Sequence, residues 1–196
     1  METLQIERND GVVTVTLNRP AKKNALNGTM WKELHATFSE ISRSDDDRVV
    51  VVTGAAGEFC SGADLSPGGA SRHQLAAMRE VGDVALLLHR LPQPTIAKVR
   101  GVAVGAGCNL ALGCDLVVAS DTARFSEIFA RRGLSIDFGG SWLLPRLVGM
   151  HRAKELALFA DIISAAEAER FGLVNRVVPD AEIDEFVAGW AARLLA

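Results

Sequence analysis

The sequence predicts an α/β fold in which strands and helices alternate along most of the chain. Short β-branched runs recur between segments in which apolar residues have helical spacing. One run of valines is long enough for a strand that is buried on both faces, and glycine-rich turns follow two of the expected strands. Right-handed crossovers would join such strands into a largely parallel sheet covered by helices.

The N-terminal quarter predicts a β-hairpin, a helix and a buried strand. Residues 4–8 and 12–18 are β-rich and flank the turn-forming run Asn9-Asp10-Gly11. After the loop at Pro20, an apolar face with helical spacing is formed by Met30, Leu34, Phe38 and Ile41. Residues 49–53 are the continuous β-branched run, and residues 54–62 are expected to form a loop.

The middle of the chain repeats a pattern of helix, strand and glycine-rich turn. A helix over residues 72–91 is expected to stop before Pro92 and Pro94. The elements expected next are a strand over 95–100, a turn over 101–107, a short helix over 106–113 and a strand over 115–119.

The C-terminal third predicts three helices. One is expected near Gly139, and a second opens with the capping box Ser164 to Glu167 and can close at Gly172. Residues 173–178 then predict a strand, and Asp180 is expected to cap the last helix. Because no internal repeat or linker is visible, residues 1–196 are expected to form a single domain.

Composition excludes several classes of function. A net charge of -3, with basic residues scattered apart from Lys22-Lys23 and Arg131-Arg132, offers no surface for nucleic acid. No apolar run approaches the roughly 18 residues that a membrane span needs, and the N-terminus lacks the layout of a signal peptide, so a cytoplasmic location without membrane attachment is expected. The three cysteines and four histidines lack metal-ligand spacing, so no metal site is expected.

Two glycine-rich segments, residues 59–65 and 101–109, each follow a predicted strand and precede a helix, where open α/β sheets usually bind ligands. The loop at residues 51–57 is superficially similar to that of short-chain dehydrogenases, but their chemistry needs a tyrosine and this chain has none. Gly105 and Gly107 begin a dinucleotide fingerprint that has Leu110 where the third glycine belongs. The glycines could also serve only to make tight turns.

Five motifs occur in one order along nearly the whole chain: LNRPAKKNALN (residues 17–27), EFCSGADL (58–65), PTIAKVRGVAVGAGCN (94–109), CDLVVA (114–119) and GLSIDFGGSWLLP (133–145). In these motifs the chain closely resembles the crotonase, or enoyl-CoA hydratase/isomerase, superfamily. The resemblance implies a spiral of repeated ββα units. It also implies homotrimers or hexamers, and a C-terminal helical segment that is short or missing here.

The resemblance further implies that the substrate is an acyl-CoA, with coenzyme A as part of the substrate and no separate cofactor. The thioester oxygen would lie between the backbone N–H groups of Ala63 and Ala106, and such preorganised donors stabilise an enolate by several kcal/mol. The residues expected to contact coenzyme A or the acyl group are Lys22, Ala25, Ala63, Asp64, Leu65 and Ala106. Asp64 is expected to anchor its loop rather than to act in catalysis.

The expected catalytic residue is Asp137. A typical hydratase has two glutamates, and the matching positions here are Asn109 and Phe129, neither of which can act as a base. Asp137 matches the acid of the family's isomerases, and one carboxylate suffices for a 1,3-proton shift. Glu127 is the competing base, expected to share a face with Phe129 in an extended segment.

The expected function is therefore that of an acyl-CoA isomerase acting through an enolate, and alternatives stay open. Asp137 could instead be a helix cap or turn residue. Hydration, thioester hydrolysis or dehalogenation could take place on the same fold, and a non-catalytic acyl-CoA-binding protein is also compatible with the loss of both hydratase acids. Phe125 and Trp142 are expected in the core rather than as stacking surfaces.

Overall fold

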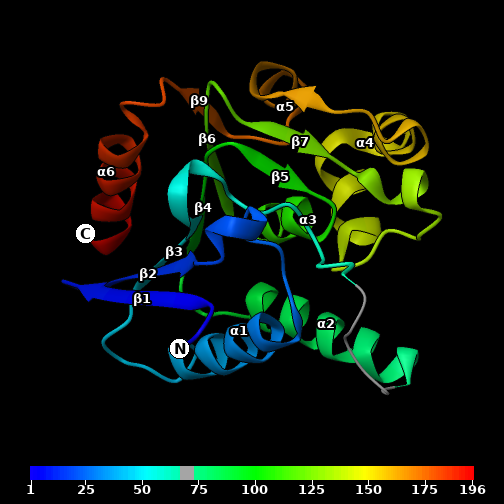
Figure 1. Ribbon diagram of the computed structural model, residues 1–196. Helices are drawn as coiled ribbons and strands as arrows, with labels where there is room; N and C mark the ends of the chain where they lie inside the picture. The colour runs from blue at the N-terminus through cyan, green and yellow to red at the C-terminus, as the bar shows by residue number, and fades with distance from the viewer. Residues whose placement is uncertain (67–72) are drawn as a thin grey trace.

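A computed structural model describes residues 1–66 and 73–196 and shows two sheets surrounded by helices (Figure 1). Within these residues, the larger sheet has six strands in the order β1-β2-β3-β4-β6-β9. The first pair is antiparallel and all following pairs are parallel. The bounds are β1 (Leu4–Asn9), β2 (Val12–Leu17), β3 (Val49–Gly54), β4 (Thr95–Val99), β6 (Leu116–Ser120) and β9 (Arg176–Val178).

The smaller sheet contains β5 (Val102–Val104), β7 (Arg124–Ser126) and β8 (Ile163–Ser164). β5 and β7 are parallel, and Cys60 extends this layer through a parallel bridge to Ala103. In the middle of the chain, β3, β4 and β6 are each followed by a segment in the small sheet, namely Cys60, β5 and β7, and then by a helix. This is the expected spiral of ββα units.

Helices cover the sheets, with bounds α1 (Gly28–Ile41), α2 (Gln74–His89), α3 (Ala106–Leu112), α4 (Gly140–Phe159), α5 (Ala165–Phe171) and α6 (Ile183–Leu195). Three short 3-10 helices lie in the connections, at η1 (Pro20–Lys22), η2 (Ala55–Gly57) and η3 (Ile128–Arg132). In Figure 1, α6 at the C-terminus lies on one side of the large sheet, away from α1 and α2.

The valine run of β3 is buried on both faces, as its composition predicts. Val50 and Val52 belong to the main core with residues of α1 and α3, whereas Val49 and Val51 pack in a second cluster under α6. Alternate residues of a strand point to opposite faces, so one run of valines fills both layers. The apolar face predicted for α1 is likewise buried.

Several local predictions are confirmed. The hairpin of β1 and β2 forms around Asp10 and Gly11, and Ser164 and Glu167 make the capping box of α5, which ends at Gly172. The helix expected over residues 72–91 is observed as α2, with Arg72 outside the described residues. Phe125 is buried in the core.

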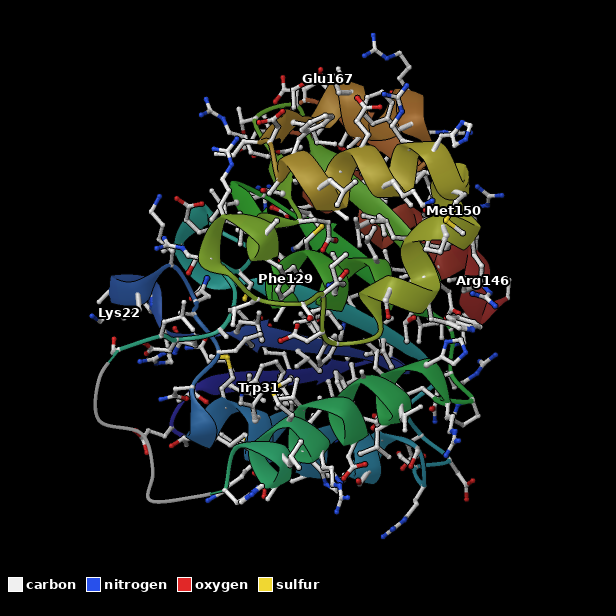
Figure 2. All side chains as sticks on the ribbon, turned by 90° about the vertical axis from the view of Figure 1, so that its right-hand side faces the viewer. Lys22, Trp31, Phe129, Arg146, Met150 and Glu167 are labelled. Carbon is white, nitrogen blue, oxygen red and sulfur yellow. The ribbon has the colours of Figure 1, made fainter. Side chains whose placement is uncertain are left out.

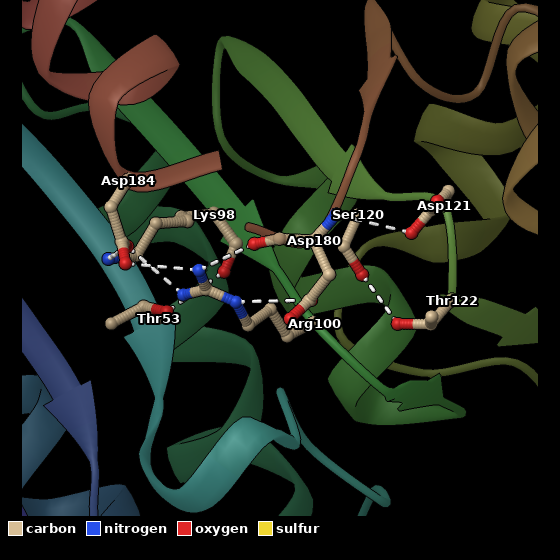
Figure 3. Close-up of polar contacts among 8 residues, drawn as sticks. All are labelled: Thr53, Lys98, Arg100, Ser120, Asp121, Thr122, Asp180 and Asp184. Atoms are coloured by element: carbon tan, nitrogen blue, oxygen red, sulfur yellow. Dashed lines mark hydrogen bonds and ion pairs between the residues drawn. The ribbon is translucent and has the colours of Figure 1, made fainter. Parts of the chain in front are cut away.

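Other local predictions are wrong. The expected turn over 101–107 contains strand β5, and the strand expected over 173–178 begins only at Arg176. Asp180 does not cap α6: the cap position is Glu182, and the Asp180 carboxylate accepts a hydrogen bond from Arg100 Nε at 3.2 Å instead (Figure 3). Trp142 is not in the core, because 48% of its surface is exposed and the Arg146 guanidinium lies 4.2 Å from the ring centroid.

Candidate functional site

The two glycine-rich loops lie side by side because backbone hydrogen bonds join them. Cys60 N–H donates to Val102 O at 2.8 Å, and Val104 N–H donates to Cys60 O at 3.0 Å. Gly62 has φ +98°, and a methyl group there would lie 2.8 Å from Val104 O and 3.8 Å from Ala106 N. Only glycine allows this backbone conformation and this close approach.

The N–H groups of Ala63 and Ala106 are both available to a ligand. Leu26 and Ala63 form a parallel bridge, in which Leu26 N–H donates to Gly62 O and Asp64 N–H donates to Leu26 O. Ala63 N–H itself has no backbone acceptor in the described part of the chain. Ala106 is the first residue of α3, where a backbone N–H has no partner within the helix. Both residues line one cavity of about 310 Å³.

This cavity brings together most of the residues singled out in the sequence. Ala25, Ala63, Asp64, Leu65, Ala106 and Asp137 all line it. Three of the candidates do not line the cavity. Lys22 is an exposed residue of η1, and Asn109 and Glu127 are buried in the protein interior. Figure 2 places Lys22 at the edge of the molecule and Phe129, which lines the cavity, near its middle.

Some lining residues were missed by sequence reasoning. Ile128, Arg132 and Leu134 line the cavity from η3 and the loop that follows it. The Arg131-Arg132 pair is visible in the sequence, but only the structure separates the two roles: Arg131 forms an ion pair with Asp161, and Arg132 lies at the cavity.

Two carboxyl groups line the cavity, and their surroundings differ. Asp64 accepts a hydrogen bond from Ser66 N–H and forms an ion pair with Arg19 at 3.0 Å. Hydrogen bonds from Ser66 and the Arg19 guanidinium lower the pKa of Asp64 to about 2. Asp64 is therefore a loop anchor and a very weak base.

Asp137 has no ion pair among the described residues. Its Oδ1 atom is buried without a hydrogen-bond partner among the described residues, and burial raises the pKa of its carboxyl group to about 6. Its backbone carbonyl accepts from Gly140 N–H at 3.0 Å, and the next residue, Phe138, has φ +47°. The carboxylate does not cap α4, whose cap position is Gly139 and has no side-chain hydrogen bond.

Asn109 and Glu127 lie next to Asp137 in the protein interior. Asn109 Nδ2 donates to Asp137 O at 3.0 Å and to Glu127 Oε2 at 3.4 Å. The side chain of Glu127 is 2% exposed, and burial raises its pKa to about 7, with a further contribution from the charge of Asp137. The extended segment expected to join Glu127 and Phe129 is wrong, because Phe129 lies in the 3-10 helix η3.

An apolar hollow of about 480 Å³ lies beside this site, between α2 and α4. Phe138 and Gly139, which directly follow Asp137, line it together with Leu86 and Trp142. An apolar group that extends from the region of Asp137 could bury its surface there.

Within residues 1–66 and 73–196, none of the helices combines the length and the hydropathy needed to cross a bilayer. In the same residues, no three His, Cys, Asp or Glu side chains gather closely enough to hold a metal ion.

Comparison with known proteins places this geometry in a family context. Residues 7–196 match the enoyl-CoA hydratase/isomerase family. A probable enoyl-CoA hydratase of Rhodobacter capsulatus is 42% identical over 193 residues, which cover 97% of this chain and 73% of that protein. The 1,2-epoxyphenylacetyl-CoA isomerase of Escherichia coli is 39% identical, covering 92% of this chain and 71% of the relative.

Solved structures agree with the sequence comparisons. The crystal structure of an enoyl-CoA hydratase from Bacillus anthracis superposes with a TM-score of 0.94 at 33% identity, covering 98% of this chain and 76% of that one. The fold is therefore that of crotonase-type enzymes.

Proposed function

The chain belongs to the enoyl-CoA hydratase/isomerase family, and from this premise we propose that it is an acyl-CoA isomerase that moves a proton through a thioester enolate. In this proposal the thioester oxygen accepts hydrogen bonds from the N–H groups of Ala63 and Ala106. Enolate formation puts negative charge on that oxygen, and fixed donors in a water-poor cavity stabilise the charge without reorganising.

The observation that carries the proposal is the contrast between the two carboxyl groups that line the cavity. A general base needs a pKa near the working pH and a free oxygen. Asp64 is held by Arg19 and Ser66 and has a pKa of about 2, whereas Asp137 has no ion pair among the described residues and a pKa of about 6. Asp137 is therefore the group suited to accept a carbon-bound proton.

The proposed reaction needs one base and no water. Asp137 removes a proton from C2 of a 3-enoyl thioester. The electron pair of the C–H bond forms a C1–C2 double bond, and the π electrons of the carbonyl move to the thioester oxygen, which gives the dienolate. The protonated Asp137 then returns the proton to C4, and the double bond shifts to C2. Asn109 and Phe129, at the positions of the two hydratase glutamates, offer no base to activate water.

The surroundings of the cavity are compatible with an acyl-CoA. Ala25, Ala63 and Leu65 line the cavity, Arg132 supplies positive charge at its wall, and Lys22 lies beside the lining residue Ser61, where its charge could meet the phosphates of coenzyme A. The apolar hollow between α2 and α4 would receive the acyl tail.

Hydration of 2-enoyl-CoA is the second candidate. It is favoured by the relative from Rhodobacter capsulatus, which is described as a probable enoyl-CoA hydratase. Hydration would require a water molecule held by Asp137 and one further group, since Glu127 is buried and does not line the cavity.

The test is to incubate the protein with 3-enoyl-CoA and, separately, with 2-enoyl-CoA, and to identify products by chromatography and mass. Isomerase activity converts the 3-enoyl to the 2-enoyl thioester at constant mass. A product heavier by one water from the 2-enoyl thioester would favour hydration, and binding without turnover of either compound would contradict both enzymatic functions.

A further inference from the structure

Glu127 is a buried carboxyl group that the proposed reaction does not use. It lies at the end of β7, just before η3, and its side chain is 2% exposed. No Lys, Arg or His forms an ion pair with Glu127 or Asp137 among the described residues. An ionised carboxylate in such a place would be strongly destabilising, so a neutral form is favoured.

In the cluster formed by Asn109, Glu127 and Asp137, acceptor oxygens outnumber donors, although the neutral Cys108 thiol also hydrogen-bonds to Glu127. Three buried oxygen atoms in it have no partner among the described residues: Asn109 Oδ1, Glu127 Oε1 and Asp137 Oδ1. The amide donor of Asn109 is already directed at Glu127 Oε2 and Asp137 O. If Glu127 carries a proton, the cluster has one more donor and one fewer buried acceptor to satisfy.

None of the titratable groups that face Glu127 in the described part of the chain is a cation that could neutralise an ionised carboxylate. The titratable ones are Cys108 on α3 and Asp137 in the loop before α4, and neither is a cation. Burial and the nearby carboxyl group raise the pKa of the Cys108 thiol well above its usual range, so the thiol stays neutral. The pKa of Asp137, about 6, is below that of Glu127, about 7, so Asp137 ionises at the lower pH, and its charge then contributes to the raised pKa of Glu127.

Asn109 is held in place between the two acids. A methyl group on Gly140 would lie 2.3 Å from both terminal atoms of the Asn109 amide, so α4 packs directly against this side chain. Asn109 is also fully buried. The link from Glu127 through Asn109 to the backbone of Asp137 is therefore rigid.

We propose that Glu127 is a positioning residue that is protonated in the active form of the enzyme and acts as a neutral hydrogen-bond donor behind Asp137, so that the only charge in the cluster is on the base. This inference rests on the proposed role of Asp137. During turnover the substrate proton moves to Asp137 and back, and the proton of Glu127 remains where it is. Two ionised carboxylates side by side would oppose formation of the enolate charge, which Glu127 in its neutral form avoids.

The test compares Glu127→Gln with Glu127→Leu in the pH profile of kcat/KM for isomerisation. Wild-type activity should rise as Asp137 ionises near pH 6 and fall as Glu127 ionises near pH 7. Glutamine is a neutral donor at every pH, so Glu127→Gln should keep the rising limb and lose the falling one. Leucine has no donor, and Glu127→Leu should lower kcat about tenfold, the cost of one buried unpaired group.

The matched control is Glu155→Gln, which removes an exposed carboxylate from α4 and should leave the wild-type profile unchanged. A falling limb that persists in Glu127→Gln, or equal losses in the glutamine and leucine variants, would overturn the proposal.

Infrared difference spectroscopy tests the proton on Glu127 without turnover. The wild type at pH 6.5 should show a protonated carboxyl band that disappears as pH rises through about 7. The band should persist in Asp137→Asn and be much weaker in Glu127→Gln, where only the fraction of Asp137 that is still protonated at pH 6.5 contributes. If no acyl-CoA is isomerised, the proposed function fails while this band can still be present; if the band is missing from the wild type, the inference on Glu127 fails while isomerisation can still occur.

Discussion

Asp137 and Asp184 belong to two clusters of polar side chains, and the pKa values of these two carboxyl groups are shifted in opposite directions. Asp184, on α6, accepts two hydrogen bonds of 3.0 Å from the Arg100 guanidinium and one of 2.7 Å from Lys98 Nζ (Figure 3). Hydrogen bonds from these two cations lower its pKa to about 2. Asp137 has no cation partner among the described residues, and burial raises its pKa to about 6.

The difference separates carboxylates that are held in ion pairs from one that has no cation partner among the described residues and is the proposed base. The Asp184 cluster consists of Lys98, Arg100, Asp180 and Asp184. It joins α6 to the C-terminal end of β4, and each of its two carboxylates forms an ion pair with a cation. The cluster of Asn109, Glu127 and Asp137 keeps three unpartnered oxygens in the protein interior. Unpaired buried polar groups reduce stability, and proteins tend to retain them where chemistry needs them.

The largest expected effect is on turnover. Asp137→Asn should lower kcat for isomerisation by about 10²–10⁴, because a positioned general base contributes a factor of that size. Asp184→Asn removes a carboxylate of the other cluster and should keep kcat within about twofold, since Asp184 lines neither the cavity nor the apolar hollow. Steady-state kinetics on a 3-enoyl-CoA measure both, and equal losses in the two variants would remove the distinction between the clusters.

A smaller effect is expected when the cluster of Asn109, Glu127 and Asp137 is disturbed without a change to either acid. Gly140→Ala places a methyl group against the Asn109 amide, which is fully buried and cannot move aside. Overpacking should lower the free energy of unfolding by about 1–3 kcal/mol. The displaced Asn109 should also lower kcat by about tenfold, as for other misplaced catalytic groups.

Gly189→Ala is the matched control for this change. No atom lies within 4 Å of the position that its methyl group would take, and the residue lies inside α6. Alanine should stabilise that helix by about 0.5–1 kcal/mol and leave kcat unchanged. Chemical denaturation measures the stabilities, and a Gly140→Ala variant with wild-type kcat would show that Asn109 does not support the base.

The smallest expected effects concern the pH dependence of stability, which should differ in sign between the clusters. The pKa of Asp184 is lowered in the folded state, so its stabilisation is present above about pH 4 and is lost as pH falls through about 2. Because the Asp184 side chain is 64% exposed, Asp184→Asn should cost only about 0.5–1 kcal/mol at pH 7.

The pKa of Asp137 is raised in the folded state, so its favourable contribution is present below about pH 4 and is lost as pH rises through about 6. Asp137→Asn should therefore be more stable than the wild type at pH 8, by about 1–3 kcal/mol, and should show no such gain at pH 4. Urea denaturation at the two pH values measures the difference. A gain that is the same at both would contradict the raised pKa.

The sequence predicts the backbone part of the site better than the buried acids. The valine run of β3, the two glycine-rich loops and the cavity positions of Ala63 and Ala106 follow from local patterns and ordered motifs. Strand β5 was missed because three residues between glycines look like a turn, and its pairing with Cys60 and β7 comes from distant parts of the chain.

The positions and partners of the acidic side chains depend on tertiary packing, which local sequence patterns do not describe. Asp180 has the sequence of a helix cap, but Arg100 lies 80 residues away along the chain and binds it. Glu127 lies between short elements with no clear periodicity, so its burial behind Asn109 could not be read from spacing. Trp142 was misplaced for the same reason: the apolar hollow that leaves it half exposed is formed by α2 and α4 together.

The most direct test of the central claim is exchange of the C2 protons of a saturated acyl-CoA with deuterium from D2O, followed by NMR. Exchange needs only the base and the oxyanion hole, because the enolate forms and is reprotonated without any other reaction. The account predicts exchange with the wild type and with Asp184→Asn, and a rate lower by about 10²-fold or more with Asp137→Asn. Exchange by Asp137→Asn at the wild-type rate would contradict Asp137 as the base.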